Sequence, residues 1–150
     1  MKAIVQRVTS ASVEVDGTVV GKIGTGLLVF VGVAKGDGEA DCRYLVEKLR
    51  TFRIFSDEQG KMNRSLVDVA GAVLLVSQFT LLGRTTNGRR PSFDDAAPPD
   101  EARGLYEQMA ADLRATGTSV ETGRFAAHMR VALVNDGPVT FTLDSRDKPS

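Results

Sequence analysis

The chain has 150 residues, a length typical of one domain. Its apolar content of 42% and charged content of 25% are ordinary for a folded globular protein and exclude a disordered or collagen-like chain. The 19 basic residues balance the 19 acidic ones, which excludes the bulk basic field of a general nucleic-acid binder. An RNA partner would therefore have to be held by local contacts.

Cysteine usage permits a reducing compartment, and the hydropathy pattern gives no sign of a membrane span. Cys42 is the only cysteine, so neither an intrachain disulfide nor a cysteine zinc cluster can form. The residues after Met1-Lys2 fit no targeting peptide, because Gln6 and Arg7 interrupt the apolar stretch. The longest apolar run, Leu27 to Ala34, is far shorter than the ~20 residues that cross a bilayer. We expect a cytoplasmic protein without a membrane partner.

Strands are expected at the start of the chain. Alternating apolar residues in 3–8 and 11–15 predict two strands, and Asp16-Gly17 predicts a tight hairpin turn before the next one. These segments together predict a β-meander. Residues 27–33 form a continuous apolar run, which is typical of a strand buried on both faces.

Two amphipathic helices and a second buried strand follow. Apolar residues recur at helical spacing from Gly38 to Phe52, and again from Pro98-Pro99 to the stop at Gly117. Between the two helices we expect a short strand at 53–55 and a strongly apolar strand at 72–79.

The remaining segments complete a single α+β domain. Residues 83–99 are polar and aperiodic and predict a long loop, a feature that is often functional. Two strands near 130–134 and 139–143 are expected to flank a turn at 135–138. Since no linker or repeat is visible, we predict one domain over 1–150, with two main helices on a mostly antiparallel, barrel-like sheet.

The residue types of common hydrolase sites are missing. His128 is the only histidine, and its neighbours Phe125 and Met129 favour a packed or surface position over a catalytic one. One histidine and one cysteine make a zinc site improbable, and no phosphate-binding glycine motif is present. We expect no metal and no cofactor.

Three segments nevertheless place polar groups where a site could form. Ser77, Gln78 and Thr80 follow an apolar strand, where they either line a pocket or only cap the strand. Gly137-Pro138 is locally a simple turn. Arg89 and Arg90, in the long loop close to Arg84 and Phe93, either contact RNA or lie on a solvated loop.

At these three places the chain resembles the D-aminoacyl-tRNA deacylase family. Residues 77–81, SQFTL, match its SQxxT motif, and 135–140, NDGPVT, match its Gly-Pro motif. The opening MKAIVQRVTSASVEVDG and the segments FRIFSDEQGKMN, GRRPSF and TGRFAAHM are similar as well. The resemblance runs from residue 1 to about 143, so residues 144–150 are expected to form a flexible tail.

The resemblance implies a homodimer that hydrolyses the ester of D-aminoacyl-tRNA at the subunit interface. In the family, a cis Gly-Pro bond enters the partner's pocket. Carried over, Gly137 and Pro138 of one subunit would complete a pocket that contains Ser77, Gln78, Phe79 and Thr80 of the other. This wall would reject L-amino acids by sterics and would exclude glycine poorly, so glycyl-tRNA is an expected second substrate.

Two further roles follow from the resemblance. The backbone N–H groups of Phe79 and Thr80 are the expected oxyanion donors, with the substrate's 2′-hydroxyl assisting; in the alternative mechanism the Thr80 hydroxyl is a covalent nucleophile. By the same resemblance, Phe125 and Met129 would pack on the terminal adenine and Arg7 would help to hold that pocket; the alternative is that each is a core residue.

Two other functions compete with this reading. One is a non-catalytic nucleic-acid-binding module of the same fold, and the other is a small-molecule esterase. No DNA partner is expected.

Overall fold

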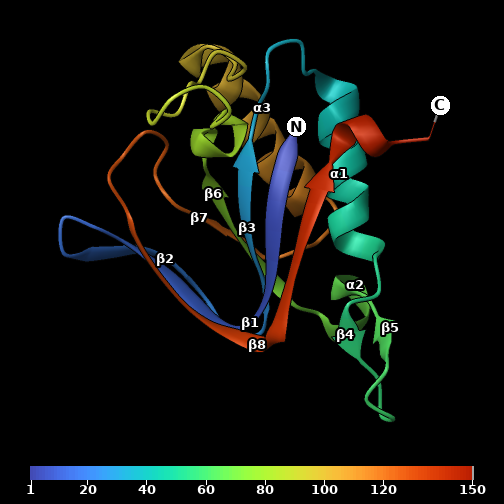
Figure 1. The fold of residues 1–150 in the computed structure, drawn as a ribbon. Coiled ribbons are helices and arrows are strands. Elements are labelled where there is room, and N and C mark those ends of the chain that lie inside the picture. The colour runs from blue at the N-terminus through green and yellow to red at the C-terminus, as the bar shows by residue number, and fades with distance from the viewer. Residues whose placement is uncertain (150) are drawn as a thin grey trace.

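The computed structural model describes residues 1–149, which fold as an α+β unit with a nearly closed, barrel-like sheet (Figure 1). None of its helices is long and apolar enough to cross a bilayer. The strands are β1 (Lys2–Val15), β2 (Thr18–Ile23), β3 (Gly26–Gly32), β4 (Phe55–Ser56), β5 (Met62–Arg64), β6 (Ala72–Ser77), β7 (Val120–Thr122) and β8 (Arg130–Asp144). The helices are α1 (Glu39–Thr51), α2 (Leu66–Val69) and α3 (Pro99–Ala115), with short 3₁₀ turns η1 (Phe79–Leu82) and η2 (Ser145–Asp147).

The first three strands form one long hairpin. Asp16 and Gly17 both have positive φ, 50° and 81°, which matches the twist of a two-residue hairpin turn. The predicted turn is confirmed, but the predicted meander is wrong. Both β2 and β3 pair with β1, one after the other along its length, because β1 is a single strand rather than two.

Strands β3, β6 and β7 are parallel neighbours, with β7 at one edge of the sheet, whereas the pairs that involve β1 are antiparallel. β3 and β6 are buried on both faces, as their apolar runs predict. One face packs on α1 and α3 through side chains such as Leu27, Leu45 and Met109. The other face holds a second core inside the curved sheet, with Leu28 and Leu74 at its centre.

The two main helices are confirmed. α1 begins after Gly38, whose N–H donates to Asp41 Oδ2 at 2.9 Å, and it buries the apolar residues that predicted it. α3 begins with Pro99 at its first turn, where the missing N–H costs nothing, and it buries Tyr106, Met109 and Leu113. Strands β5 and β7 and helix α2 were not predicted.

The end of the chain differs from the prediction in two ways. β8 is one strand of 15 residues rather than two, and it pairs with β1 on both sides of the Gly-Pro segment. Residues 144–147 are also not a flexible tail. Ser145 is fully buried, and its hydroxyl donates to Asp41 Oδ1 at 2.7 Å, so η2 is docked against α1. Residue 150 lies outside the described residues.

Candidate active site

The parallel strands bring their carboxyl ends to one edge of the sheet. Ser77 pairs with Val31, and Leu75 pairs with Thr122, so the segments that follow β3, β6 and β7 all leave at this edge (Figure 1). In sheets with parallel strands, whether open or closed into a barrel, ligands bind at the carboxyl ends of the strands. Polar residues that are far apart in sequence therefore meet here.

A groove with a volume of about 690 Å³ occupies this edge, within the size range of small-molecule sites. It brings together five of the predicted residues: Ser77, Gln78, Phe79, Phe125 and Met129. It is also lined by residues that the sequence did not single out, among them Phe30, Lys35 and Pro98. No local signal marks Phe30 or Lys35, because only the fold turns their side chains toward the groove.

The segment after β6 forms one wall. Gln78 N–H still donates to Val31 O at 2.8 Å, and the chain then turns into η1. This turn packs closely on Gly32, where an added Cβ would lie 2.5 Å from Leu82 Cδ2 and 2.9 Å from Gln78 O. Gly32 is thus needed for the position of η1.

Phe79 and Thr80 lie at the exposed start of η1. The first N–H groups of a helix have no carbonyl in a preceding turn to bond, so those of Phe79 and Thr80 are available to a ligand. Gln78 Nε2 donates a hydrogen bond to Thr80 Oγ1. The Phe79 ring is 57% exposed and meets Phe93 edge-to-face, with ring centroids 4.9 Å apart.

The segment after β7 forms the facing wall. It folds back so that Met129 covers Gly123, where an added Cβ would lie 2.6 Å from Met129 Sδ. Phe125 packs against Tyr106, with ring centroids 5.9 Å apart. His128, for which the sequence favoured a packed or surface position, lines the groove beside Met129 and is exposed.

Gly137 and Pro138 lie away from this groove. Their peptide bond is cis, and both residues are exposed. Between the pairs Val8 with Asn135 and Gln6 with Thr140, residues 136–139 loop out of β8 opposite Arg7. Within one chain, Gly137 and Pro138 therefore do not line the groove that contains Ser77, Gln78 and Phe79.

Arg7 and Asn135 hold this loop in place. Buried Arg7 donates through Nε to Asp136 O at 2.8 Å and through Nη1 to Ile54 O at 2.7 Å. Asn135 Oδ1 accepts a 2.7 Å bond from Val139 N–H. Arg7 thus lies beneath the Gly-Pro loop and does not line the groove of its own chain beside Phe125 and Met129.

The arginines of the long loop lie outside the groove. The loop closes on itself where Arg84 and Ser92 exchange two backbone hydrogen bonds, and Arg84 pairs with Asp95. Arg89 and Arg90 are exposed near its tip and do not line the groove.

Two titratable side chains, Cys42 of α1 and Tyr106 of α3, are buried and serve packing. Burial raises the pKa of the Cys42 thiol to about 12, with Asp112 adding to the effect, so Cys42 is not a reactive thiolate. Burial also raises the pKa of Tyr106 to about 12, and its hydroxyl donates to Leu75 O at 2.8 Å. Within residues 1–149, no group of three or more His, Cys, Asp or Glu could hold a metal ion.

Comparison with known proteins gives a consistent result. Residues 4–144 match the family model described as D-Tyr-tRNA(Tyr) deacylase. A D-aminoacyl-tRNA deacylase of Heliobacterium modesticaldum is 59% identical over 146 residues, which cover 97% of both chains. One of Geobacter sulfurreducens is 56% identical and covers 100% of this chain and 99% of the relative.

Two solved structures share the fold. The c-Myc DNA Unwinding Element Binding Protein superposes with a TM-score of 0.91 and 39% identity, covering 100% of both chains. A structure described as a probable eukaryotic D-amino acid tRNA deacylase has a TM-score of 0.83 and 18% identity, covering 95% of this chain and 98% of that one.

Proposed function

Because the chain belongs to the D-Tyr-tRNA(Tyr) deacylase family, a family of ester hydrolases, we propose that it hydrolyses the ester bond of D-aminoacyl-tRNA. The products are a free D-amino acid and tRNA. The observation that carries the proposal is the groove, where the Ser77–Phe79 segment faces Phe125 and Met129 across one cavity. The proposal implies action in the cytoplasm, where charged tRNA is used.

The two walls of the groove suit the two parts of the substrate's end, which are the terminal adenosine and the aminoacyl ester. An adenine base is flat and apolar on its faces, so it packs well on Phe125 and Met129. The ester would then lie toward Ser77 and the start of η1, where the polar groups are. A volume of about 690 Å³ accommodates a nucleoside with an attached amino acid.

The start of η1 supplies oxyanion stabilisation. The Phe79 and Thr80 N–H groups lie side by side in the first turn, as needed for two donors to one oxygen. The Thr80 hydroxyl accepts a hydrogen bond from Gln78, and no hydrogen bond within residues 1–149 joins it to a base such as His128. We therefore assign water activation to the substrate's 2′-hydroxyl rather than covalent attack to Thr80.

Selection against L-amino acids would come from a second copy of the chain. Gly137 and Pro138 are exposed and braced by Arg7, yet they lie away from the groove of their own subunit. A homodimer in which this loop enters the partner's groove would place a rigid backbone wall beside the amino acid. Such a wall leaves room for a D-side chain and for glycine, so glycyl-tRNA would also be hydrolysed.

The test compares D-Tyr-tRNA with L-Tyr-tRNA as substrates of the purified protein. We expect the D-ester to be cleaved at least tens of fold faster, a gap of about 2 kcal/mol in transition-state stabilisation. Equal rates would refute the chiral filter. No hydrolysis of either substrate would instead favour a nucleic-acid-binding module of this fold.

A pair of variants tests the oxyanion assignment. Phe79→Pro removes both the ring and the N–H at a position where a helix tolerates proline, whereas Phe79→Ala removes the ring alone. The loss of one oxyanion donor should lower kcat by roughly 10²–10³-fold in Phe79→Pro relative to Phe79→Ala. Equal activity of the two variants, with both shown to be folded by circular dichroism, would overturn the assignment.

A further inference from the structure

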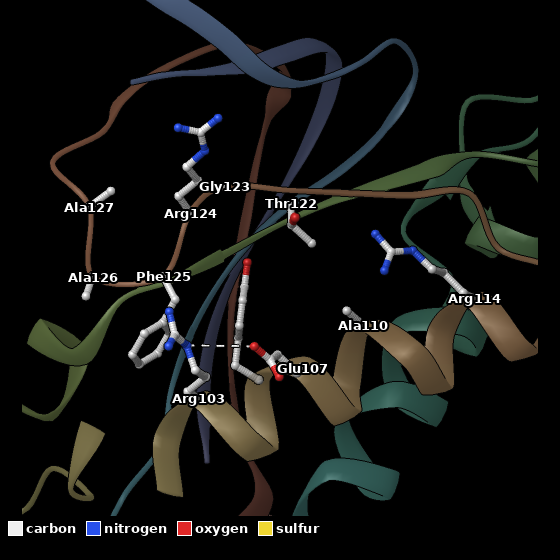
Figure 2. A pocket seen from close by; sticks show the side chains of 11 residues that line it. Arg103, Glu107, Ala110, Arg114, Thr122, Gly123, Arg124, Phe125, Ala126 and Ala127 are labelled. Atoms are coloured by element: carbon white, nitrogen blue, oxygen red, sulfur yellow. Dashed lines mark ion pairs between the residues drawn. The ribbon is translucent and has the colours of Figure 1, made fainter. Parts of the chain in front are cut away.

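A second cavity lies on the other side of the turn that carries Phe125. Its volume is about 490 Å³, and it opens between α3 and the segment after β7 (Figure 2). Phe125, Ala126 and Ala127 line both this cavity and the groove. A polynucleotide whose last nucleoside fills the groove therefore needs to pass only one turn of chain to reach the second cavity.

Three arginines line the second cavity. Arg103 and Arg114 come from α3 and Arg124 from the facing segment, against Glu107 as the one acidic residue in the lining. Arg103 Nε lies 3.7 Å from Glu107 Oε1, but both side chains are more than half exposed, so water largely screens this pair. The cavity thus keeps a net positive charge in a protein whose total charge is balanced.

Two of these arginines are held by the surrounding structure. Arg103 Cζ lies 5.1 Å from the Phe125 ring centroid, a cation–π contact, and Figure 2 shows the two side chains next to each other. Arg114 Nη2 donates to Val120 O at 3.1 Å, at the start of β7. Both therefore face the cavity with restricted freedom, which lowers the entropy cost of binding an anion.

The turn between the two cavities has a fixed shape. Ala127 N–H donates to Arg124 O at 3.2 Å, and Ala126 has a φ of 62°, which is unfavourable for a residue with a side chain. Backbone outliers of this kind concentrate at ligand-binding sites. Phe125 lines both cavities, and the same turn positions Arg124.

We propose that this cavity binds the backbone phosphates of the nucleotides that immediately precede the terminal adenosine of the substrate. The inference rests on the proposed function, and it adds a subsite for the RNA strand beyond the esterified nucleoside. Arginine suits this role, because its planar guanidinium bonds phosphate oxygens in a bidentate manner. Phosphate contacts carry no base sequence, so this subsite would accept tRNAs of different identity.

The test compares two D-tyrosyl esters, one on full tRNA and one on adenosine alone, which lacks the preceding phosphates. Arg103→Gln and Arg124→Gln are the test variants. Arg43→Gln is the matched control, since Arg43 also forms an exposed (i, i+4) pair at 3.7 Å, with Glu39 on α1, outside the cavity. Each test variant should raise KM for the tRNA ester roughly tenfold, the effect of losing one charge-assisted hydrogen bond. Hydrolysis of the adenosine ester should stay at the level of the Arg43→Gln control.

Binding of an uncharged RNA oligonucleotide that ends in CCA gives a readout independent of hydrolysis. The slope of log affinity against log salt should fall by about 0.7 for each arginine removed, the value for one single-strand phosphate contact. Replacing the last phosphodiesters by neutral methylphosphonates should weaken binding to the wild type but not to the double variant. Equal effects of the variants on both esters, or an unchanged salt slope, would overturn the proposal. If the wild type cleaves neither ester, the proposed function is refuted. The RNA-binding measurement still shows whether this cavity binds phosphates.

Discussion

Replacing Gly32 with alanine tests whether the position of η1 sets the rate of hydrolysis. The added methyl group would lie 2.5 Å from Leu82 Cδ2 and 2.9 Å from the backbone oxygen of Gln78. Because a backbone oxygen cannot rotate away as a side chain can, η1 must move outward. Overpacking of this kind costs about 1–3 kcal/mol in the free energy of unfolding. A shift of about 1 Å at the reacting groups lowers a rate by roughly 10²-fold.

Gly71→Ala is the matched control for this prediction. Its added methyl would lie 2.8 Å from Leu66 Cδ1, in the core at the opposite end of β6 from Ser77. We expect both variants to lose stability in denaturant titrations. Only Gly32→Ala should lose a factor of roughly 10–10² in kcat/KM for D-Tyr-tRNA. Equal kinetic losses in the two variants, or full activity of Gly32→Ala, would refute the link between η1 and catalysis.

Three further outcomes are expected. Thr80→Ala should keep substantial deacylation activity, while a substrate with a 2′-deoxy terminal adenosine should not turn over; a trapped acyl ester on Thr80 would contradict this. Cys42 should resist iodoacetamide at pH 8 until the protein unfolds, because burial raises its pKa to about 12; rapid labelling of the native protein would contradict its burial. Burial alone would raise the pKa of Asp41, but hydrogen bonds from Gly38, Ser145 and Lys148 hold it below its usual value. The resulting stability is present above the unfolded pKa of about 3.9 and is lost as pH falls through the folded value. Asp41→Asn should therefore be less stable than the wild type at pH 7, with a gap in denaturant titrations that narrows below pH ~4; a gap that does not change with pH would contradict this.

The polar wall of the groove could be predicted because its signals are local. The apolar run up to Val76 predicts a buried strand, and the polar residues after it must then lie at the strand's end. The facing wall could be assigned only by resemblance, because Phe125 and Met129 carry no local mark of a site. They meet Ser77 because β7 pairs in parallel with β6, a long-range contact that residue periodicity does not encode.

The wrong predictions for the end of the chain have the same cause, namely contacts between segments far apart in the sequence. The residues Asn135 to Pro138 are strong turn formers, yet β8 continues past them because β1 pairs with it on both sides and Arg7 holds the loop. The tail after Leu143 has no amphipathic pattern, but Ser145 is buried against Asp41, a residue about a hundred positions earlier in the sequence. Contacts between distant segments determine the backbone conformation at both positions, so the local sequence could not predict it.

Mixing two inactive variants tests most directly whether each active site is shared between subunits. One variant carries Gly137→Ala, whose added Cβ would lie 2.6 Å from Val139 Cγ2, so we expect the displaced loop to obstruct the partner's groove and to block D-esters as well; the other carries Phe79→Pro. Random subunit exchange makes about half of the dimers heterodimers, each with one intact site of two, so roughly a quarter of the wild-type D-Tyr-tRNA deacylase activity should return. No recovery after exchange that is verified by mass spectrometry, or a protein that sediments as a monomer, would contradict a shared site.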